Sequence, residues 1–239
     1  MARELYLFRG GPEESRREFS DRILAELAGR VLPRDAGPCK VSVTCEDPPA
    51  LSVIPFRRDT AALVTLEDDG SERGEEGGES RERDAGLRWL PVLSDVEGLA
   101  GAYRARCAFP VSYDRDWVDG QPTPGAGMLT LFRRRRGIDA ATFIRRWHEG
   151  HTPLSLRIHP LWNYVRNVVE AAPLEGSPWF DGIVEEHCRR REDLLCPVRF
   201  FGGLWRMPVN MVRVYADIKG FIDYSSIETY LVTEIHLRG

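Results

Sequence analysis

The chain has 239 residues, enough for one large domain or two small ones, and its 42% hydrophobic and 29% charged residues are ordinary for a globular protein. No run approaches the roughly 18 apolar residues that a membrane helix needs, and the N-terminal residues hold no apolar stretch of signal-peptide length. These features exclude an integral membrane protein of the helical type, and we expect a cytoplasmic protein that does not bind membranes.

One segment dominates the charge. Residues 67–84 contain nine acidic and three basic side chains and contribute −6, whereas the whole chain carries −4. Such a Gly-rich, charged stretch cannot bury enough apolar surface to fold on its own, so we expect a disordered acidic insertion over about 67–86. Its role is left open, with an acidic docking segment as the sharper alternative.

The basic run FRRRRG at 132–137 follows an expected strand. It has no interleaved aromatic residues and no nucleic-acid motif around it, which favours a solvated turn and no nucleic-acid partner. The five cysteines are scattered and never form a C-x-x-C pair, which argues against a disulfide framework and a zinc knuckle. We therefore expect reduced thiols and no metal site among them.

The chain contains an internal repeat at an offset of 124 residues. The segment that begins LYLFRGG recurs as LTLFRRR, so that Leu5, Leu7, Phe8 and Arg9 match Leu129, Leu131, Phe132 and Arg133. Further identities follow in the same register, within an amphipathic helical pattern in both copies. The repeat indicates two related structural units.

Each unit is expected to begin with an alternating strand and a helix, and to continue with two strands, a helix and a closing strand. The expected strands cover 4–8, 40–46, 61–67 and 101–111 in the first copy and 128–132, 162–170, 180–186 and 228–237 in the second. Asp139 is a suitable N-cap for the helix of the second copy, and Pro153 marks its expected end. This order predicts an α+β fold of two ferredoxin-like (βαββαβ) repeats, whose sheets pack face to face or close into one barrel within the chain.

The domain boundaries follow from the repeat. The first copy covers 1–113, a Gly- and Pro-containing linker covers 114–126, and the second copy covers 127–239. The linker region also contains tyrosine, tryptophan and aspartate, so we expect it to pack over the barrel and line a cavity.

The second copy resembles the EthD family of the dimeric α+β barrel superfamily. The resemblance rests on FIRRWHEGHTPL, YVRNVV and FDGIVEE, and the first copy is identified as a diverged, degenerate version through the repeat. The resemblance implies that two ferredoxin-like units form a barrel, here within one chain. Relatives in the superfamily include polyketide cyclases, dehydratases, decarboxylases and cofactor-free or haem-dependent oxidative enzymes, so the resemblance implies the fold more firmly than the reaction.

Three of the five histidines lie in the stretch 143–160: His148, His151 and His159. Helical spacing places His151 on the same line as Phe143 and Trp147, which points it inward, whereas His148 lies about 100° around the helix. An inward imidazole can accept and return protons near neutral pH. A capping or core histidine is the structural alternative. Copy one has Leu27 at the position of His151, so packing alone does not require a histidine there.

A metal site is a weaker interpretation of the same stretch. HEGH is one residue short of the H-E-x-x-H zinc motif, and a zinc enzyme needs a third protein ligand. We therefore predict neither metal nor cofactor, with haem ligation as an outside alternative.

Other side chains of the second copy are candidates for the same site. We expect the catalytic set to be His151, His148 and Tyr164, with Tyr164 stabilising a developing enolate oxygen. The expected substrate-binding residues are Trp147, Trp162, Arg166, Asp181, Trp179 and Tyr224.

The leading functional hypothesis is an EthD-like, cofactor-independent lyase or cyclase that acts on a small hydrophobic carbonyl or polyketide-like compound by dehydration, decarboxylation or aldol-type proton transfer. A non-catalytic barrel that binds such a compound is the first alternative, and a haem- or metal-dependent oxidative enzyme is the second. A homodimer is left open.

Overall fold

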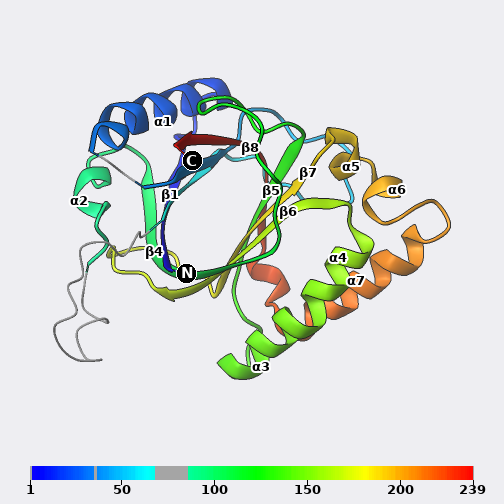
Figure 1. Ribbon diagram of the computed structural model, residues 1–239. Coiled ribbons are helices and arrows are strands. Elements are labelled where there is room, and N and C mark those ends of the chain that lie inside the picture. The colour runs from blue at the N-terminus through cyan, green and yellow to red at the C-terminus, as the bar shows by residue number, and fades with distance from the viewer. Residues whose placement is uncertain (1, 35–36, 68–85, 239) are drawn as a thin grey trace.

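Eight antiparallel strands close into a barrel in the computed structural model, which describes residues 2–34, 37–67 and 86–238 (Figure 1). The acidic insertion expected at 67–86 lies outside the described residues apart from its two ends. The fold combines helices with a closed barrel of strands, and the sequence predicts both features.

The order of strands around the barrel is β1-β3-β2-β8-β5-β7-β6-β4, so the two halves of the chain meet at β2–β8 and at β4–β6. All eight expected strands are present, β3 with the expected bounds and the other seven with shifted ends. Their bounds are β1 (Ala2–Arg9), β2 (Cys39–Val43), β3 (Ala61–Glu67), β4 (Leu99–Val111), β5 (Ala126–Phe132), β6 (Leu161–Ala171), β7 (Gly182–Cys188) and β8 (Glu228–Arg238).

The barrel interior is apolar over much of its length and polar towards one end. Alternate residues of each strand point inward, and one buried cluster includes Leu7, Leu63 and Leu131. Further along the axis, the ammonium of Lys40 lies 2.7 Å from Glu185 and 3.0 Å from Glu234. A buried cation with two carboxylate partners satisfies the rule that charges inside proteins are paired.

Helices cover the outside of the barrel in two groups (Figure 1). The first group is α1 (Arg16–Arg30), η1 (Leu32–Arg34) and α2 (Leu90–Leu93). Ser15 and Glu18 form a capping box that starts α1. The apolar face of α1, with Phe19, Ile23 and Leu27, belongs to a buried core cluster that fills the space beneath it.

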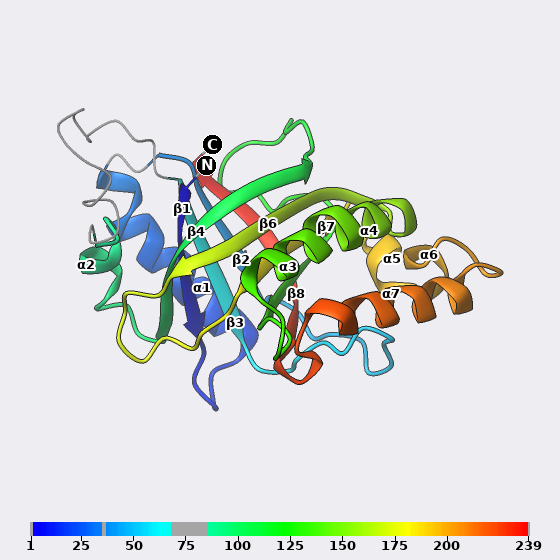
Figure 2. The same cartoon turned by 90° about the horizontal axis from the view of Figure 1, so that it is seen from below.

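The second group lies against the sheet formed by the other half of the chain. It consists of α3 (Ala140–Arg145), the π-helical segment η2 (Arg146–His151), α4 (Thr152–Ile158), α5 (Arg191–Leu195), α6 (Pro197–Phe200), α7 (Met207–Phe221) and η3 (Tyr224–Ser226). Figure 2 shows α3 and α4 as one continuous rod, with α7 alongside. Asp139 caps α3 as predicted, since its carboxylate accepts from the backbone N–H of Thr142 at 2.7 Å.

The expectation that this helix ends near Pro153 is wrong. Pro153 lies in the first turn of α4, where a missing N–H costs least, and the rod continues to Ile158. The π-helical segment precedes it, and the backbone N–H of Thr152 bonds to the carbonyl of Trp147, five residues back. Wider turns of this kind are frequent at functional sites.

The connection between the two halves lies over the polar end of the barrel. The backbone N–H of Gly120 donates to the carbonyl of His236 at 2.7 Å, and that of Thr123 donates to Glu234 at 2.7 Å. Tyr113 packs on Trp117 with ring centres 5.0 Å apart. Within the described residues, no helix is long and apolar enough to cross a membrane.

Candidate functional site

A cavity of about 640 Å³ separates the second group of helices from the outer face of the sheet. This volume falls within the roughly 300–1,000 Å³ that is typical of small-molecule sites. Strands β5, β6, β7 and β8 form its floor, and η2, α4, α6 and α7 form its walls. Its lining is mostly apolar and includes Met128, Phe132, Val184, Phe200, Phe201, Met211, Val214, Ile218 and Ile222.

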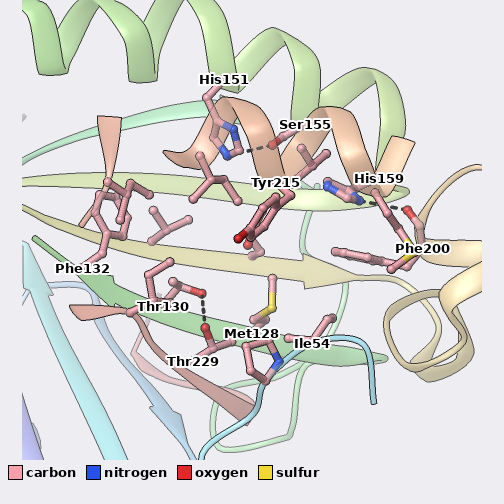
Figure 3. Close-up of a pocket in the computed structure, with 18 of the residues that line it drawn as sticks. Ile54, Met128, Thr130, Phe132, His151, Ser155, His159, Phe200, Tyr215 and Thr229 are labelled. Atoms are coloured by element: carbon pink, nitrogen blue, oxygen red, sulfur yellow. Dashed lines mark hydrogen bonds between the residues drawn. The ribbon is translucent and has the colours of Figure 1, made fainter. Parts of the chain in front are cut away.

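The helical wall presents one histidine held on both ring nitrogens. His151 Nδ1 lies 2.7 Å from a carboxylate oxygen of Asp217 on α7. Its Nε2 lies 3.1 Å from the hydroxyl of Ser155 (Figure 3). The carboxylate accepts the Nδ1–H, which leaves Nε2 to accept from the serine in the neutral ring. Asp217 therefore orients an imidazole that borders the cavity.

The sheet floor carries the tyrosine predicted to act with this histidine. Tyr164 on β6 is 1% exposed, and its hydroxyl oxygen accepts from the indole N–H of Trp147 at 3.4 Å. Burial raises the pKa of Tyr164, so its hydroxyl keeps its proton at every physiological pH. Both side chains line the cavity.

An acidic residue of the same floor, Glu186 on β7, is not among the site residues predicted from the sequence. It pairs across the sheet with Met128 on one side and with Tyr164 on the other. No hydrogen bond or ion pair with another described residue engages its carboxyl group, and burial alone raises its pKa from 4.5 to about 7. A half-buried carboxyl group of this kind, facing an apolar cavity, is a strong functional candidate.

A signal for Glu186 was present in the alternation of β7. Ile183 and Glu185 point into the barrel, so Val184 and Glu186 point to the helices. An acidic residue next to an apolar one on a helix-facing strand surface is unusual.

His148 and His151 lie in the same π-helical segment, but only His151 lines the cavity. Its ring packs on Trp147, with centres 5.3 Å apart, and its Nε2 is buried without a hydrogen-bond partner. Burial, together with the nearby charges of Arg166 and Arg106, lowers its pKa to about 4. His148 is therefore neutral at pH 7 and directed away from the site.

Arg166 is also outside the cavity. Its guanidinium donates to the hydroxyl of Thr152 at 2.9 Å, and that hydroxyl donates to the backbone carbonyl of Trp147 at 3.0 Å. Arg166 thus supports the π-helical segment from the neighbouring strand β6. Its expected role in substrate binding stays a prediction.

Three other predicted binding residues lie elsewhere. Trp162 packs on Tyr113 with ring centres 4.8 Å apart, because a register shift between Leu161 and Asn163 interrupts the alternation of β6. Asp181 accepts from the backbone N–H of Arg134 at 2.9 Å. Trp179 is 46% exposed and is not part of the cavity lining.

The remaining predicted residue, Tyr224, lines the cavity at its mouth. It is 44% exposed and meets Tyr215 edge to face, with ring centres 5.3 Å apart. His159 also borders the cavity, where its Nδ1–H donates to the carbonyl of Phe200 at 2.9 Å and burial lowers its pKa to about 4. Within the described part of the chain, no group of three or more His, Cys, Asp or Glu side chains is arranged to hold a metal ion.

The fold is an α+β barrel, with a cavity of small-molecule size between its helices and its sheet. No family model matches the sequence, and no curated protein matches it. Among solved structures, the chain is similar to a provisionally named monooxygenase from Fusobacterium nucleatum, with a TM-score of 0.51, 8% identity and coverage of 99% of this chain and 92% of that chain. It is also similar to an anthrone oxidase-like protein, with a TM-score of 0.52, 13% identity and coverage of 99% and 93%.

At these identities the likeness shows the fold alone. No comparison supports the EthD family in particular.

Proposed function

We propose that this protein is an enzyme that binds a small hydrophobic carbonyl or phenolic compound and removes a proton from it, with Glu186 as the base. The observation that carries the proposal is the carboxyl group of Glu186, which faces an apolar cavity and has a pKa of about 7. A general base works best when its pKa lies near the working pH, because it is then ionised and still a strong acceptor.

The cost of such a group argues for catalysis rather than binding alone. An unpaired carboxylate in an apolar site opposes folding, and the described residues offer it no compensating partner. A leucine or glutamine at position 186 would serve a binding protein equally well without that cost.

The other polar groups of the cavity suit the oxygen of the substrate. The hydroxyl of Tyr164 keeps its proton and lies on the strand next to Glu186, so it is suited to donate to the oxygen on which negative charge develops. The Asp217-oriented imidazole of His151 on the opposite wall is suited to return a proton in a later step.

For the fate of the carbanion or enolate, reaction with molecular oxygen is the first choice. The names of the two similar structures, a monooxygenase and an anthrone oxidase-like protein, support it. In the overall reaction, a CH₂ group beside an activated ring system becomes a C=O group. Dioxygen accepts four electrons, and one of its atoms enters the product while the other leaves as water. The carbon-bound protons leave by way of Glu186.

A lyase or cyclase reaction is the second candidate. It begins with the same proton abstraction, and the facing His151 favours it because dehydration needs an acid to protonate the leaving hydroxyl.

Anthrone in air-saturated buffer provides the test. Oxygen consumption and the absorbance of the quinone would be followed for the natural protein, for Glu186→Gln, and for the matched control Glu149→Gln, whose side chain is exposed on η2. We expect quinone formation that Glu186→Gln lowers at least hundredfold and Glu149→Gln leaves unchanged. Equal rates in both variants would remove Glu186 from the mechanism, and ligand binding without any turnover would favour the binding protein.

We also interpret the two halves of the chain as ferredoxin-like units. Two observations support this interpretation. Read in one direction around the barrel, the strand order is β4-β1-β3-β2 in the first half and β8-β5-β7-β6 in the second, so corresponding strands occupy corresponding places. The order of strands and helices along the chain also matches between the halves.

A further inference from the structure

A second cavity of about 440 Å³ opens inside the barrel, at its polar end. Its lining comes from the inward-facing residues of β1, β2, β3, β4, β6 and β8 and from the connection between the two halves. It lies on the other side of the sheet from the first cavity. On β6, Asn163 and Val165 face the second cavity, whereas Tyr164 between them faces the first.

The second cavity is rich in positive charge. The basic residues among its lining are Arg3, Lys40, Arg115 and Arg238, and Glu67 is the one carboxylate among the described lining residues. Two further carboxylates, Glu185 and Glu234, lie behind Lys40 and already balance it. Asp119 faces Arg115 from the rim. Together with Glu67, these carboxylates equal the four basic residues in number, so the case for an anion rests on the arginine donors that have no partner.

Arg3 is the most unusual of these residues. It is only 4% exposed, its Nη2 donates to Glu67, and its Nε and Nη1 have neither a hydrogen-bond partner nor contact with solvent. Its guanidinium lies 4.5 Å from the ring centre of Phe109. A buried donor that loses water and gains no partner opposes folding, so a native structure with two on one side chain calls for an acceptor.

A second arginine of this cavity also has a buried donor without a hydrogen-bond partner. Arg115 donates from Nη2 to Asp119, whereas its Nη1 is buried without a partner. Arg115 lies on the connecting segment and lines the same cavity as Arg3. Two arginines of one cavity lining thus have unfilled donors.

We propose that this cavity is a second binding site, which takes a small organic carboxylate. The guanidinium groups of Arg3 and Arg115 turn towards the cavity on binding, and the carboxylate group then accepts from their unfilled donors, for which a planar carboxylate is a good match. The body of the ligand lies against the rings of Phe109 and Tyr113, which also line the cavity. These aromatic walls and the volume favour an organic anion over a bare inorganic one.

Titration calorimetry with benzoate tests the assignment, with benzyl alcohol as the neutral match and inorganic phosphate as the inorganic anion. We expect benzoate to bind and to weaken at least tenfold in Arg115→Gln, which removes one unfilled donor from a partly exposed side chain. Arg3→Gln should weaken binding as much or more. The matched control Arg17→Gln, on the exposed face of α1, should bind as the natural protein does.

Several results would overturn the proposal. If benzyl alcohol binds as tightly as benzoate, the cavity does not recognise the negative charge. If phosphate binds more tightly than benzoate, the cavity does not recognise the organic part of the ligand. Unchanged benzoate affinity in Arg115→Gln would place the ligand elsewhere. Should Arg3→Gln fail to fold, as judged by circular dichroism, the Arg115 variant decides alone.

Discussion

Replacing Glu186 with glutamine should stabilise the protein at alkaline pH while it abolishes proton abstraction. In the unfolded chain this carboxyl group has a pKa near 4.5, and burial raises it to about 7 in the folded protein. Between these two values the unfolded state loses its proton while the folded state keeps it. The stability of the natural protein therefore falls as pH rises through this window, and stays level above about 7.

The size of the effect follows from the same pKa values. A tenfold change in proton affinity corresponds to about 1.4 kcal/mol, so the shift from 4.5 to about 7 sets a ceiling of about 3 kcal/mol. Because water in the cavity solvates part of the carboxylate, we expect roughly half of this, ~1–2 kcal/mol. Glutamine does not titrate, so the Glu186→Gln protein escapes this loss.

The assay is urea unfolding of the natural protein, Glu186→Gln and Glu149→Gln at pH 4.5 and pH 8.5. The advantage of Glu186→Gln over the natural protein should grow by ~1–2 kcal/mol between the two pH values, whereas Glu149→Gln should differ by no more than about 0.5 kcal/mol at either. An advantage that is the same at both pH values would refute the argument that Glu186 is buried without a partner. In turnover, kcat of the natural protein should rise with pH through about 7 as the base ionises.

Three further predictions concern other groups. His151→Ala should lower kcat for anthrone about hundredfold, and Asp217→Asn by less, because the amide still contacts the ring; oxygen consumption measures both, and full activity in either would contradict the roles assigned. Thr152→Val deprives Arg166 and the π-helical segment of one hydroxyl and should cost about 1–3 kcal/mol in thermal unfolding, with an unchanged Tm as the opposing result. Lys40→Met leaves two buried carboxylates unpaired and should cost about 3–5 kcal/mol in urea unfolding; a loss below about 1 kcal/mol would count against the paired cluster.

The strands could be predicted from sequence because alternating residues and a repeat at fixed offset are countable patterns, whereas the closed barrel was implied by the family resemblance. The inward line of the helix, from Phe143 through Trp147 to His151, was accessible in the same way, and both Trp147 and His151 border the cavity. Tyr164 was predicted at the site because it follows the same strand alternation.

The missing parts depend on facts that local patterns do not carry. Strand alternation places Glu185 and Glu186 on opposite faces of β7. Both faces are buried in a barrel covered by helices, so alternation alone does not tell which face carries Lys40 and which borders a cavity. The register shift beside Trp162 is not visible in the sequence, and it decides where this side chain points. For His148, helical spacing already placed the ring about 100° around from Trp147, and the structure keeps it out of the cavity lining.

The closure of the barrel within a single chain has a consequence for how the protein behaves on dilution. A barrel assembled from two chains comes apart as its concentration falls below the dissociation constant, and a site that depends on the closed form is lost with it. Here the two halves pair through β2–β8 and β4–β6, and one segment of the chain connects them covalently. The barrel therefore persists at any protein concentration. Specific activity should therefore stay constant down to nanomolar protein. The two sheet edges that a separate subunit would expose on dissociation stay paired at every concentration.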